Sequence, residues 1–493
     1  MHRLDEPMKN LLSRRNVLQA FGGALGAATL SQTARSEDQK PAFLIVLGAA
    51  GGASMIDAFL AIRASESANA STLNTFPDAS VVSIPESPLR SVDTSDTSIG
   101  PIPFGYSTSQ SAFLKKHYQD MLVATLTGTS VNHTVAQERA RTGNGAWLGR
   151  TLEECVANHF GAASALPNVN MATGGFAARG LDASLPLWAF GAPVAAPALW
   201  PFGLDGARGI KGAPDLELVS QARSLRDKKL EPGTSFMRAF GDGEALALWK
   251  QQRTDAVTKL EGSNLIEKLN LLPDTAATPL SQYGLASSPD AATLAATFTN
   301  LGTDELEAQA ALAYLLIKNR VSASVTIAPS FSVLLGGGGI LNPPLAFDFS
   351  HTANRATQAI MWSRILGVAD KLIGLLKSAP LDPSGSESLW DRTLIYVATD
   401  FGRSKTRPAD STDFGSGHDL DNGVLLLSPM VKGNRILGGV NPDTGLTHGF
   451  DLTTGVPDPG RTTSEAEIFS GILDAMGVDT TGAGLPAVTA FRG

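Results

Sequence analysis

The sequence predicts an α/β fold, a doubly wound and mostly parallel sheet with helices on both faces. Short apolar runs end at glycine or polar residues, and they alternate with segments whose apolar residues recur at helical spacing. An uninterrupted apolar run is typical of a central strand that is buried on both sides. Alternation of such strands with helices favours a parallel sheet.

The first expected strand sets the pattern for the others. Residues 42–47 are uniformly apolar and stop at the glycine-rich stretch 48–52, which indicates a buried strand that feeds a turn. The expected strands are residues 42–47, 121–126, 321–328, 331–335, 393–398 and 423–427.

The clearest expected helix covers residues 356–376, where Met361, Ile365, Val368 and Leu372 recur at steps of four and three. Ser464-Glu-Ala-Glu467 has the form of a capping box that opens the last helix. Helices are also expected at residues 55–62, 137–141, 147–160, 238–272, 304–320 and 464–476.

The N-terminus has the layout of an export signal. Ser13-Arg14-Arg15-Asn16-Val17-Leu18 precedes a short apolar, glycine-rich run that ends near Leu30. The paired arginines resemble the twin-arginine consensus, which makes the twin-arginine translocase the expected partner during export. Residues 1–34 are therefore assigned to the signal peptide, and the mature protein is expected to be periplasmic or secreted.

The rest of the chain, residues 35–493, is expected to form a single large domain with a helical, Pro/Gly-rich insertion at about residues 161–300. No run of 18 apolar residues follows the signal, so no transmembrane segment is expected in the mature chain. The single cysteine, Cys155, excludes an intramolecular disulfide.

The charge of the chain bears on its partners. The formal net charge is −8, and residues 1–34 hold four basic and two acidic side chains, which leaves about −10 for the remainder. An acidic body argues against nucleic acid as a partner, because phosphate binding needs a basic surface.

Residues able to carry chemistry gather after the expected strands. Ligands of open α/β sheets bind beyond the carboxyl ends of the strands, where Asp and His side chains can hold divalent metal ions such as zinc or manganese. Two such ions can clamp a phosphoryl or sulfuryl transfer, and a Ser or Thr at a helix N-terminus can serve as the nucleophile. The candidates are Asp57, Ser130, Asn132, His133, Thr134, Asp348, His351, Asp400 and His418.

Five stretches together resemble a bacterial family known as domain of unknown function 1501, whose members are typically twin-arginine exported and similar in fold to alkaline phosphatases and sulfatases. The stretches are Leu44 to Gly52, Ser130-Val-Asn-His133, Thr142 to Arg150, Phe347 to Asn354, and Thr399-Asp-Phe-Gly-Arg403 with Gly417-His418. They span nearly the whole chain after the signal, in the order that the family has them.

The resemblance implies a divalent metal cofactor (zinc, manganese or calcium) and a small anionic ester as substrate. Its metal ligands would be Asp57, Asp348, His351, Asp400 and His418. The nucleophile would be Ser130, Thr134 or no residue at all, with His133 also catalytic, and the substrate-binding residues would be Asn132 and Arg403. Arg403 could instead pair with Asp400.

Two departures from the family pattern leave the function open between two classes. Ala53-Ser54 stand where the family has an acidic residue, and Phe401 stands at the histidine position of the second Asp/His pair. The leading interpretation is an exported metal-dependent hydrolase of phosphate or sulfate esters. The alternative is a degenerate, non-catalytic periplasmic binding or assembly protein on the same fold.

Overall fold

The computed structural model describes residues 40–94, 109–204, 211–212, 214–240, 243, 246, 250, 260, 263–329, 332–335, 338–341 and 346–492. The predicted signal peptide lies outside these residues. Among the helices of the described part of the chain, none combines the length and the apolar character that crossing a membrane requires.

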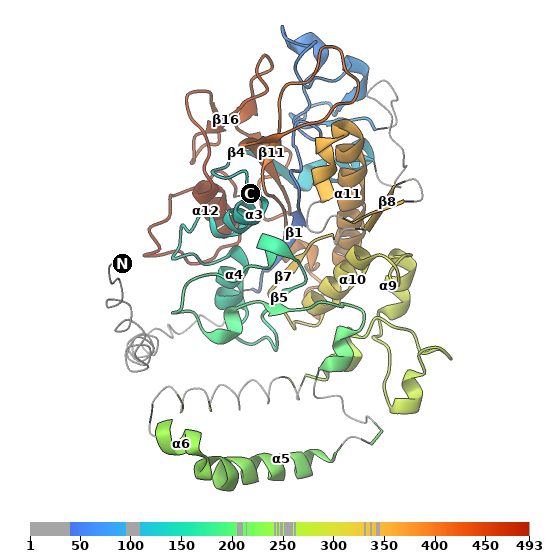
Figure 1. Cartoon of the computed structure of the whole chain (residues 1–493), viewed down its shortest axis with the longest axis vertical. Helices are drawn as coiled ribbons and strands as arrows, with labels where there is room; N and C mark the ends of the chain where they lie inside the picture. Colours follow the sequence, from blue (N-terminus) through green and yellow to red (C-terminus); the bar gives the residue numbers. More distant parts are fainter. Residues whose placement is uncertain are drawn as a thin grey trace, which may run out of the picture. The chain divides into compact units, whose positions relative to one another are not determined.

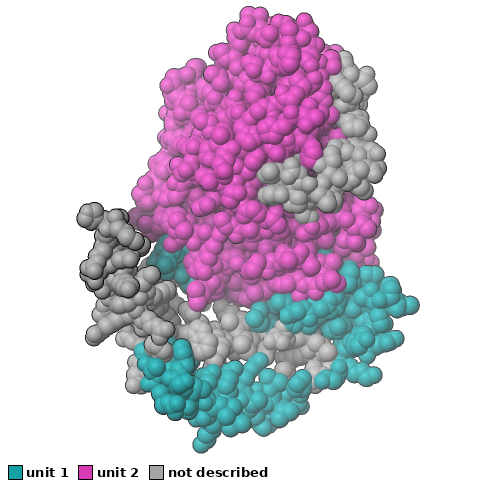
Figure 2. All heavy atoms as spheres, viewed as in Figure 1, with its two compact units in different colours: residues 1–40, 182–186, 201–288 teal, residues 41–181, 187–200, 289–493 magenta. Residues whose placement is uncertain are grey.

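The chain divides into two compact units, which Figure 2 colours separately. The larger comprises residues 41–181, 187–200 and 289–493. The smaller comprises residues 1–40, 182–186 and 201–288, so the predicted insertion at about 161–300 contributes residues to both units.

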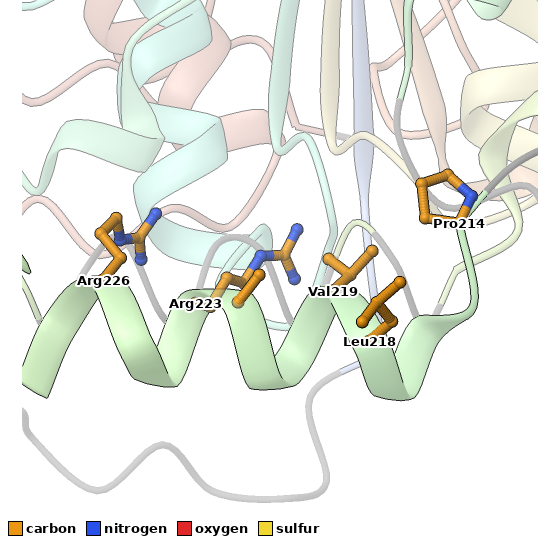
Figure 3. A pocket seen from close by; sticks show the side chains of 6 residues that line it. Pro214, Leu218, Val219, Arg223 and Arg226 are labelled. Carbon is orange, nitrogen blue, oxygen red and sulfur yellow. The ribbon is translucent and has the colours of Figure 1, made fainter.

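The smaller unit contains the helices α5 (Leu216–Leu225), α6 (Ser235–Phe240) and α8 (Leu265–Leu269). A surface hollow of about 410 Å³ runs along α5, and Figure 3 shows the side chains that line it. Apolar Leu218 and Val219 lie at one end of this hollow and Arg223 and Arg226 at the other.

The larger unit is built on an eight-stranded sheet with the order β14-β4-β13-β10-β1-β7-β5-β6. Its strands are β1 (Phe43–Ala49), β4 (Met121–Thr127), β5 (Asn168–Asn170), β6 (Ala192–Pro193), β7 (Ser324–Ile327), β10 (Thr393–Thr399), β13 (Asp421–Leu427) and β14 (Arg435–Leu437). Within this sheet only β13 runs against its neighbours, because it pairs antiparallel with both β10 and β4. The expected α/β fold with a mostly parallel sheet is confirmed.

The centre of the sheet decides where the site lies. Every residue of β1 and β10 is buried, as expected of strands that are covered on both faces. The two strands are parallel, and their register pairs Ala49 with Thr399. The turn after β1 and the residues after β10 therefore leave the same edge of the sheet side by side.

Helices flank this sheet (Figure 1). On one face α3 (His133–Thr142), α4 (Leu152–Phe160) and α12 (Glu465–Ala475) contact one another. On the other face α10 (Glu305–Lys318) packs against β7 and against α11 (Asn354–Ser378). The unit also contains α2 (Gln110–His117) and α9 (Ala291–Thr297).

The helix expected at 356–376 forms as α11 without a side-chain cap, and the helices expected at 304–320 and 464–476 form as α10 and α12. Asp304 accepts hydrogen bonds from the backbone N–H groups of Leu306 and Glu307 and starts α10. Ser464 and Glu467 form the predicted capping box of α12.

Three predicted elements differ from the structure. Residues 55–62 form turns rather than a helix, and the segment is tied at its two ends to Asn422 and Phe76. The helix expected at 147–160 begins only at Leu152, because Leu148 has a φ of +53° and is 67% exposed. The strand expected at 331–335 forms as β8 (Ser332–Leu335), which pairs with β9 (Gly338–Leu341) outside the central sheet.

Part of the helix expected at 238–272 lies outside the described residues, and the described part is not one helix. It contains the end of α6 and the whole of α8, and Asn264, which precedes α8, has a φ of +49°. Short two- and three-stranded pairings complete the larger unit: β2 (Val81–Ser83) with β3 (Arg90–Val92), β11 (Gly402–Arg403) with β12 (His418–Asp419), and β15 (Gly439–Val440), β16 (Thr447–Phe450) and β17 (Pro457–Asp458).

Candidate metal centre

The turn after β1 is held by buried side chains at each successive backbone N–H group. Gly51 N–H donates to Asp400 Oδ2 at 2.9 Å, and Gly52 N–H donates to Asp400 Oδ1 at 2.6 Å. The next three N–H groups donate to Thr399 Oγ1, Gln358 Oε1 and Asn422 Oδ1. A buried loop needs a partner for every backbone polar group, and these side chains supply them.

Asp400 links this turn to His133. Its side chain is fully buried, and Oδ2 lies 2.8 Å from His133 Nδ1, at the first residue of α3. A carboxylate oxygen in this position accepts the Nδ1–H and fixes the tautomer of the ring. His133 therefore presents an Nε2 atom without a hydrogen when the imidazole is neutral.

His418 is oriented in the same way by a backbone carbonyl. Its Nδ1 lies 3.0 Å from the carbonyl oxygen of Val131, which follows β4. The ring edge that carries Nε2 is thus turned toward the space that His133 also faces, and the centroids of the two rings are 4.7 Å apart.

Asp348 lies among these imidazoles. It belongs to the short helix η11 (Ala346–His351), which precedes α11. Its Oδ1 is 3.2 Å from His133 Nε2, 3.1 Å from His351 Nε2 and 3.6 Å from His418 Nε2. One ligand atom each from His133, Asp348 and His418 lies within 4.8 Å of the other two.

This donor set fits a divalent metal ion. Imidazole nitrogens and a carboxylate oxygen are ligands that zinc and related ions take in proteins. His351 Nε2 lies 2.9 Å from His418 Nε2, whose lone pair can accept a hydrogen bond from the Nε2–H tautomer of His351. Metal-binding histidines usually have the other ring nitrogen bound as His133 and His418 do.

Contacts among the charged groups shift the pKa values of His133 and Asp348 in opposite directions. Burial alone would lower the pKa of His133, but its hydrogen bonds to Asp348 and Asp400 outweigh burial and raise that pKa to about 9. Burial would raise the pKa of Asp348, but hydrogen bonds from His133 and Arg403 hold it well below its usual range. The raised pKa of His133 and the lowered pKa of Asp348 fit an ion pair, and a metal ion bound at Nε2 would take the place of the proton there.

Arg403 and Phe401 close the buried side of the site. Arg403 Nη2 lies 3.2 Å from Asp348 Oδ1, and Nη1 lies 3.4 Å from His351 Nε2. The ring centroid of Phe401 lies 4.6 Å from the ring centroid of His133 and 4.1 Å from that of His418. Burial lowers the pKa of His418 first, and the charge of Arg403 lowers it further, which favours the neutral ligand form.

Of the five predicted metal ligands, the structure brings Asp348, His351 and His418 into direct contact. Asp400 touches His133 instead, with both of its oxygens accepting backbone N–H groups. Asp57 is buried elsewhere: its Oδ1 accepts from the side-chain amides of Asn74 and Asn354 at 3.0 Å each. His133, predicted as catalytic, lies with Asp348 and His418 in the possible metal-binding group.

Three of the other predicted residues, Ser130, Asn132 and Thr134, lie at or just before the start of α3. Asn132, expected to bind substrate, is the N-cap residue, and its Oδ1 accepts from Val135 N–H. Ser130 Oγ accepts from the N–H of Asn132 at 3.1 Å. Thr134 lies in the first turn of α3 and is exposed. Arg403, also expected to bind substrate, has a fully buried side chain that pairs with Asp348.

The sequence did not indicate Gln137, which supports the site from one turn along α3. Its Nε2 lies 3.5 Å from Asp400 Oδ2, and its Oε1 accepts from Gly175 N–H at 2.9 Å. Gln137 follows His133 by four residues, so the two share a helix face. That spacing is the feature of the sequence that could have identified Gln137 as part of the site.

No protein-family model matches this chain, and none of the curated proteins matches it in sequence. Fold and site define it as an α/β protein whose mostly parallel sheet carries a possible metal-binding group of His133, Asp348 and His418 beyond the carboxyl ends of its strands.

Proposed function

We propose that this chain is an exported metal-dependent hydrolase of phosphate or sulfate esters whose ion is held by His133, Asp348 and His418. The observation that carries the proposal is the anchoring of both imidazoles at Nδ1, by Asp400 at 2.8 Å and by the Val131 carbonyl at 3.0 Å. This anchoring supports a site organised to present Nε2 atoms to a cation. The resemblance to domain of unknown function 1501 supports the ester class and the twin-arginine route.

Each residue of the site has a part in the proposed reaction. A divalent ion bound there would polarise the ester oxygens and lower the pKa of water. Asp400 keeps the His133 ring in place. His351, whose side chain is 45% exposed, offers Nε2 beside Asp348 and is the proposed acid and base toward solvent.

The proposed nucleophile is the Ser130 hydroxyl. Its oxygen accepts from Asn132 N–H, which leaves its hydrogen available to a base. If the Ser130→Ala and Thr134→Ala variants both keep full activity, water is the nucleophile. If only Ser130→Ala is inactive with its metal content unchanged, the serine is assigned.

A second function is favoured by a specific observation. Both oxygens of Asp400 are used by the turn after β1, and the apolar ring of Phe401 lies against His133 and His418. These contacts leave fewer metal ligands than a two-ion phosphatase-like site uses. They favour the alternative proposal of a non-catalytic binding or assembly protein that retains one ion.

Metal content and ester hydrolysis measured on the same samples separate the two proposals. The full-length chain is exported, purified without chelators or affinity metals, and analysed for metals beside His418→Ala and a control, His448→Ala. His448 is half-buried in β16, and its Nδ1 lies 3.2 Å from the Gly449 carbonyl oxygen. Hydrolysis of p-nitrophenyl phosphate and of p-nitrocatechol sulfate is then assayed.

A hydrolase requires bound metal and activity that are both lost in His418→Ala and both kept in His448→Ala. Bound metal without turnover of either ester supports the binding protein. A folded chain that neither retains nor takes up zinc, manganese or calcium overturns both metal-based proposals.

A further inference from the structure

We propose that the site takes a single divalent ion because the guanidinium of Arg403 is a built-in second positive charge that excludes a second ion from Asp348. The inference rests on the proposed metal site but not on hydrolysis. It assigns Arg403 a positioning role inside the protein, in place of the substrate contact that the sequence suggested.

The guanidinium has no room to be a substrate ligand. The side chain of Arg403 is fully buried, and it is surrounded by groups that bear negative or partial negative charge. Nη2 binds the carbonyls of Gly51 and Phe347 as well as Asp348, and Nη1 binds the Ser416 carbonyl at 3.2 Å. These four acceptors fix the cation against Asp348.

The turn after β1 is shaped around this cation. Gly52 has a φ of +83°, and a Cβ atom there would lie 2.6 Å from Arg403 Nε. The space that a side chain at residue 52 would fill is therefore taken by the guanidinium. Arg403 also pairs with His418 in register across β11 and β12, which places its backbone beside a metal ligand.

The charge count of the site favours one ion. The carboxylates of Asp348 and Asp400 and the guanidinium of Arg403 together leave one negative charge when the imidazoles are neutral. A single divalent ion turns this into one positive charge, which suits an anionic ester. A second divalent ion would leave three positive charges in a partly buried site, where like charges repel more strongly than in water.

His351 marks the position that a second ion would need. Its Nε2 lies 3.1 Å from Asp348 Oδ1 and 3.4 Å from Arg403 Nη1. A second ion bound by His351 and Asp348 would thus come into contact with the guanidinium. Excluding a second ion from the position between His351 and Asp348 requires the positive charge of Arg403, and not merely the volume of its side chain.

The experiment counts ions on the full-length chain. Metal-stripped protein is titrated with Mn²⁺, the ions bound per chain are measured by native mass spectrometry, and the bound Mn²⁺ is examined by electron paramagnetic resonance. The wild type and Arg403→Lys are expected to stop at one ion with an uncoupled signal. Arg403→Met, which removes the charge and keeps the bulk, is expected to reach two ions with a coupled signal.

Arg364→Met is the control, because Arg364 is a buried arginine that pairs with Asp304 at 2.9 Å. It is expected to bind one ion. Two coupled ions in the wild type would overturn the inference even if Arg403→Met fails to fold. One ion in a folded Arg403→Met would also overturn it. No ion in any variant would instead contradict the metal site of the proposed function.

Discussion

Asp400 Oδ2 joins distant parts of the chain, because it accepts hydrogen bonds from His133 Nδ1 at 2.8 Å and from Gly51 N–H at 2.9 Å. A single buried carboxylate therefore joins the turn after β1 to the start of α3. Its loss would disturb the fold and the candidate metal site together.

Asp400→Asn is expected to lower the free energy of unfolding by about 3–5 kcal/mol, because it removes one member of a buried pair. The new amide nitrogen cannot accept the N–H groups that Asp400 now binds. The affinity for metal is expected to fall by about 10- to 100-fold, as when the partner of a metal-binding histidine is removed. Urea unfolding and metal titration measure the two effects.

Asp458→Asn serves as the control, since Asp458 is exposed and its carboxylate accepts a hydrogen bond from the Gly460 N–H. It is expected to change stability by less than about 1 kcal/mol. Unchanged metal affinity in a folded Asp400→Asn would contradict the positioning of His133 by this carboxylate.

Two glycines with similar backbone angles allow strain and crowding to be separated. Gly52 and Gly145 have φ values of +83° and +79°, but of the two only Gly52 has atoms within 4 Å of the position that a Cβ would take, the nearest being Arg403 Nε. Gly145→Ala is expected to cost about 1 kcal/mol from backbone strain. Gly52→Ala should cost about 2–4 kcal/mol, since overpacking adds to the strain.

Thermal or urea unfolding of the two alanine variants tests this difference. Equal losses of stability would show that Arg403 gives way freely, and that the turn is not shaped around it. The metal content of Gly52→Ala provides a second readout, because a displaced Arg403 changes its contact with Asp348.

The fold could be predicted because the central strands are uniformly apolar. β1 and β10 needed no other signal, since both are buried along their whole length. The antiparallel direction of β13 could not be predicted, because an apolar run does not encode strand direction. β5 and β6 have three and two residues, too few for a periodic signal.

The turns at residues 55–62 could not be predicted from the local sequence either. Their side chains are almost all buried, so their apolar pattern carries no helical face. Met55 N–H donates to Asn422, and the Met55 carbonyl accepts from both Ala58 and Leu60. The bond to Asn422 comes from the tertiary fold and not from local propensity.

The candidate site could be predicted as a set of residues but not as an arrangement. Asp348, His351, Asp400 and His418 were recognisable because they follow strands and belong to the quoted stretches. The distinction between Asp348, which faces the imidazoles, and Asp400, which holds the turn, depends on which N–H groups meet each carboxylate. That distinction arises only when β1 and β10 pair in register.

A buried ion pair between α3 and α4 provides a third prediction. Arg141 Nε lies 2.7 Å from Glu153 Oε1, and both side chains are almost inaccessible to solvent. Arg141→Met leaves the carboxylate buried without its cationic partner, although Thr326 Oγ1 still donates to it, and is expected to cost about 3–5 kcal/mol. The double variant Arg141→Met, Glu153→Gln should cost less than the sum of the single variants.

Unfolding free energies of the four proteins in this double-mutant cycle give the coupling energy. A value near 2 kcal/mol or more is expected for a buried contact of this kind. Simple additivity would show that Arg141 acts through its hydrogen bonds to the Gly175 and Ala178 carbonyls rather than through Glu153.

The last prediction concerns acid stability and uses a pair away from the metal site. Asp370 Oδ1 lies 2.6 Å from His117 Nε2 and 2.6 Å from Lys116 Nζ. Burial would raise the pKa of Asp370, but hydrogen bonds from His117 and Lys116 outweigh it and lower the pKa below its usual value. A carboxylate with a lowered folded-state pKa stabilises the fold above its unfolded pKa of about 3.9.

This stabilisation is lost as the pH falls through the lower, folded-state pKa of Asp370. Asp370→Asn is therefore expected to be less stable than the wild type at pH 5 by about 1–2 kcal/mol, a modest value because the side chain is 23% exposed. The difference should shrink steadily in urea unfolding at pH 5, 4 and 3. A difference that grows toward low pH would mean that the ionised carboxylate destabilises the fold, contrary to its contacts with Lys116 and His117.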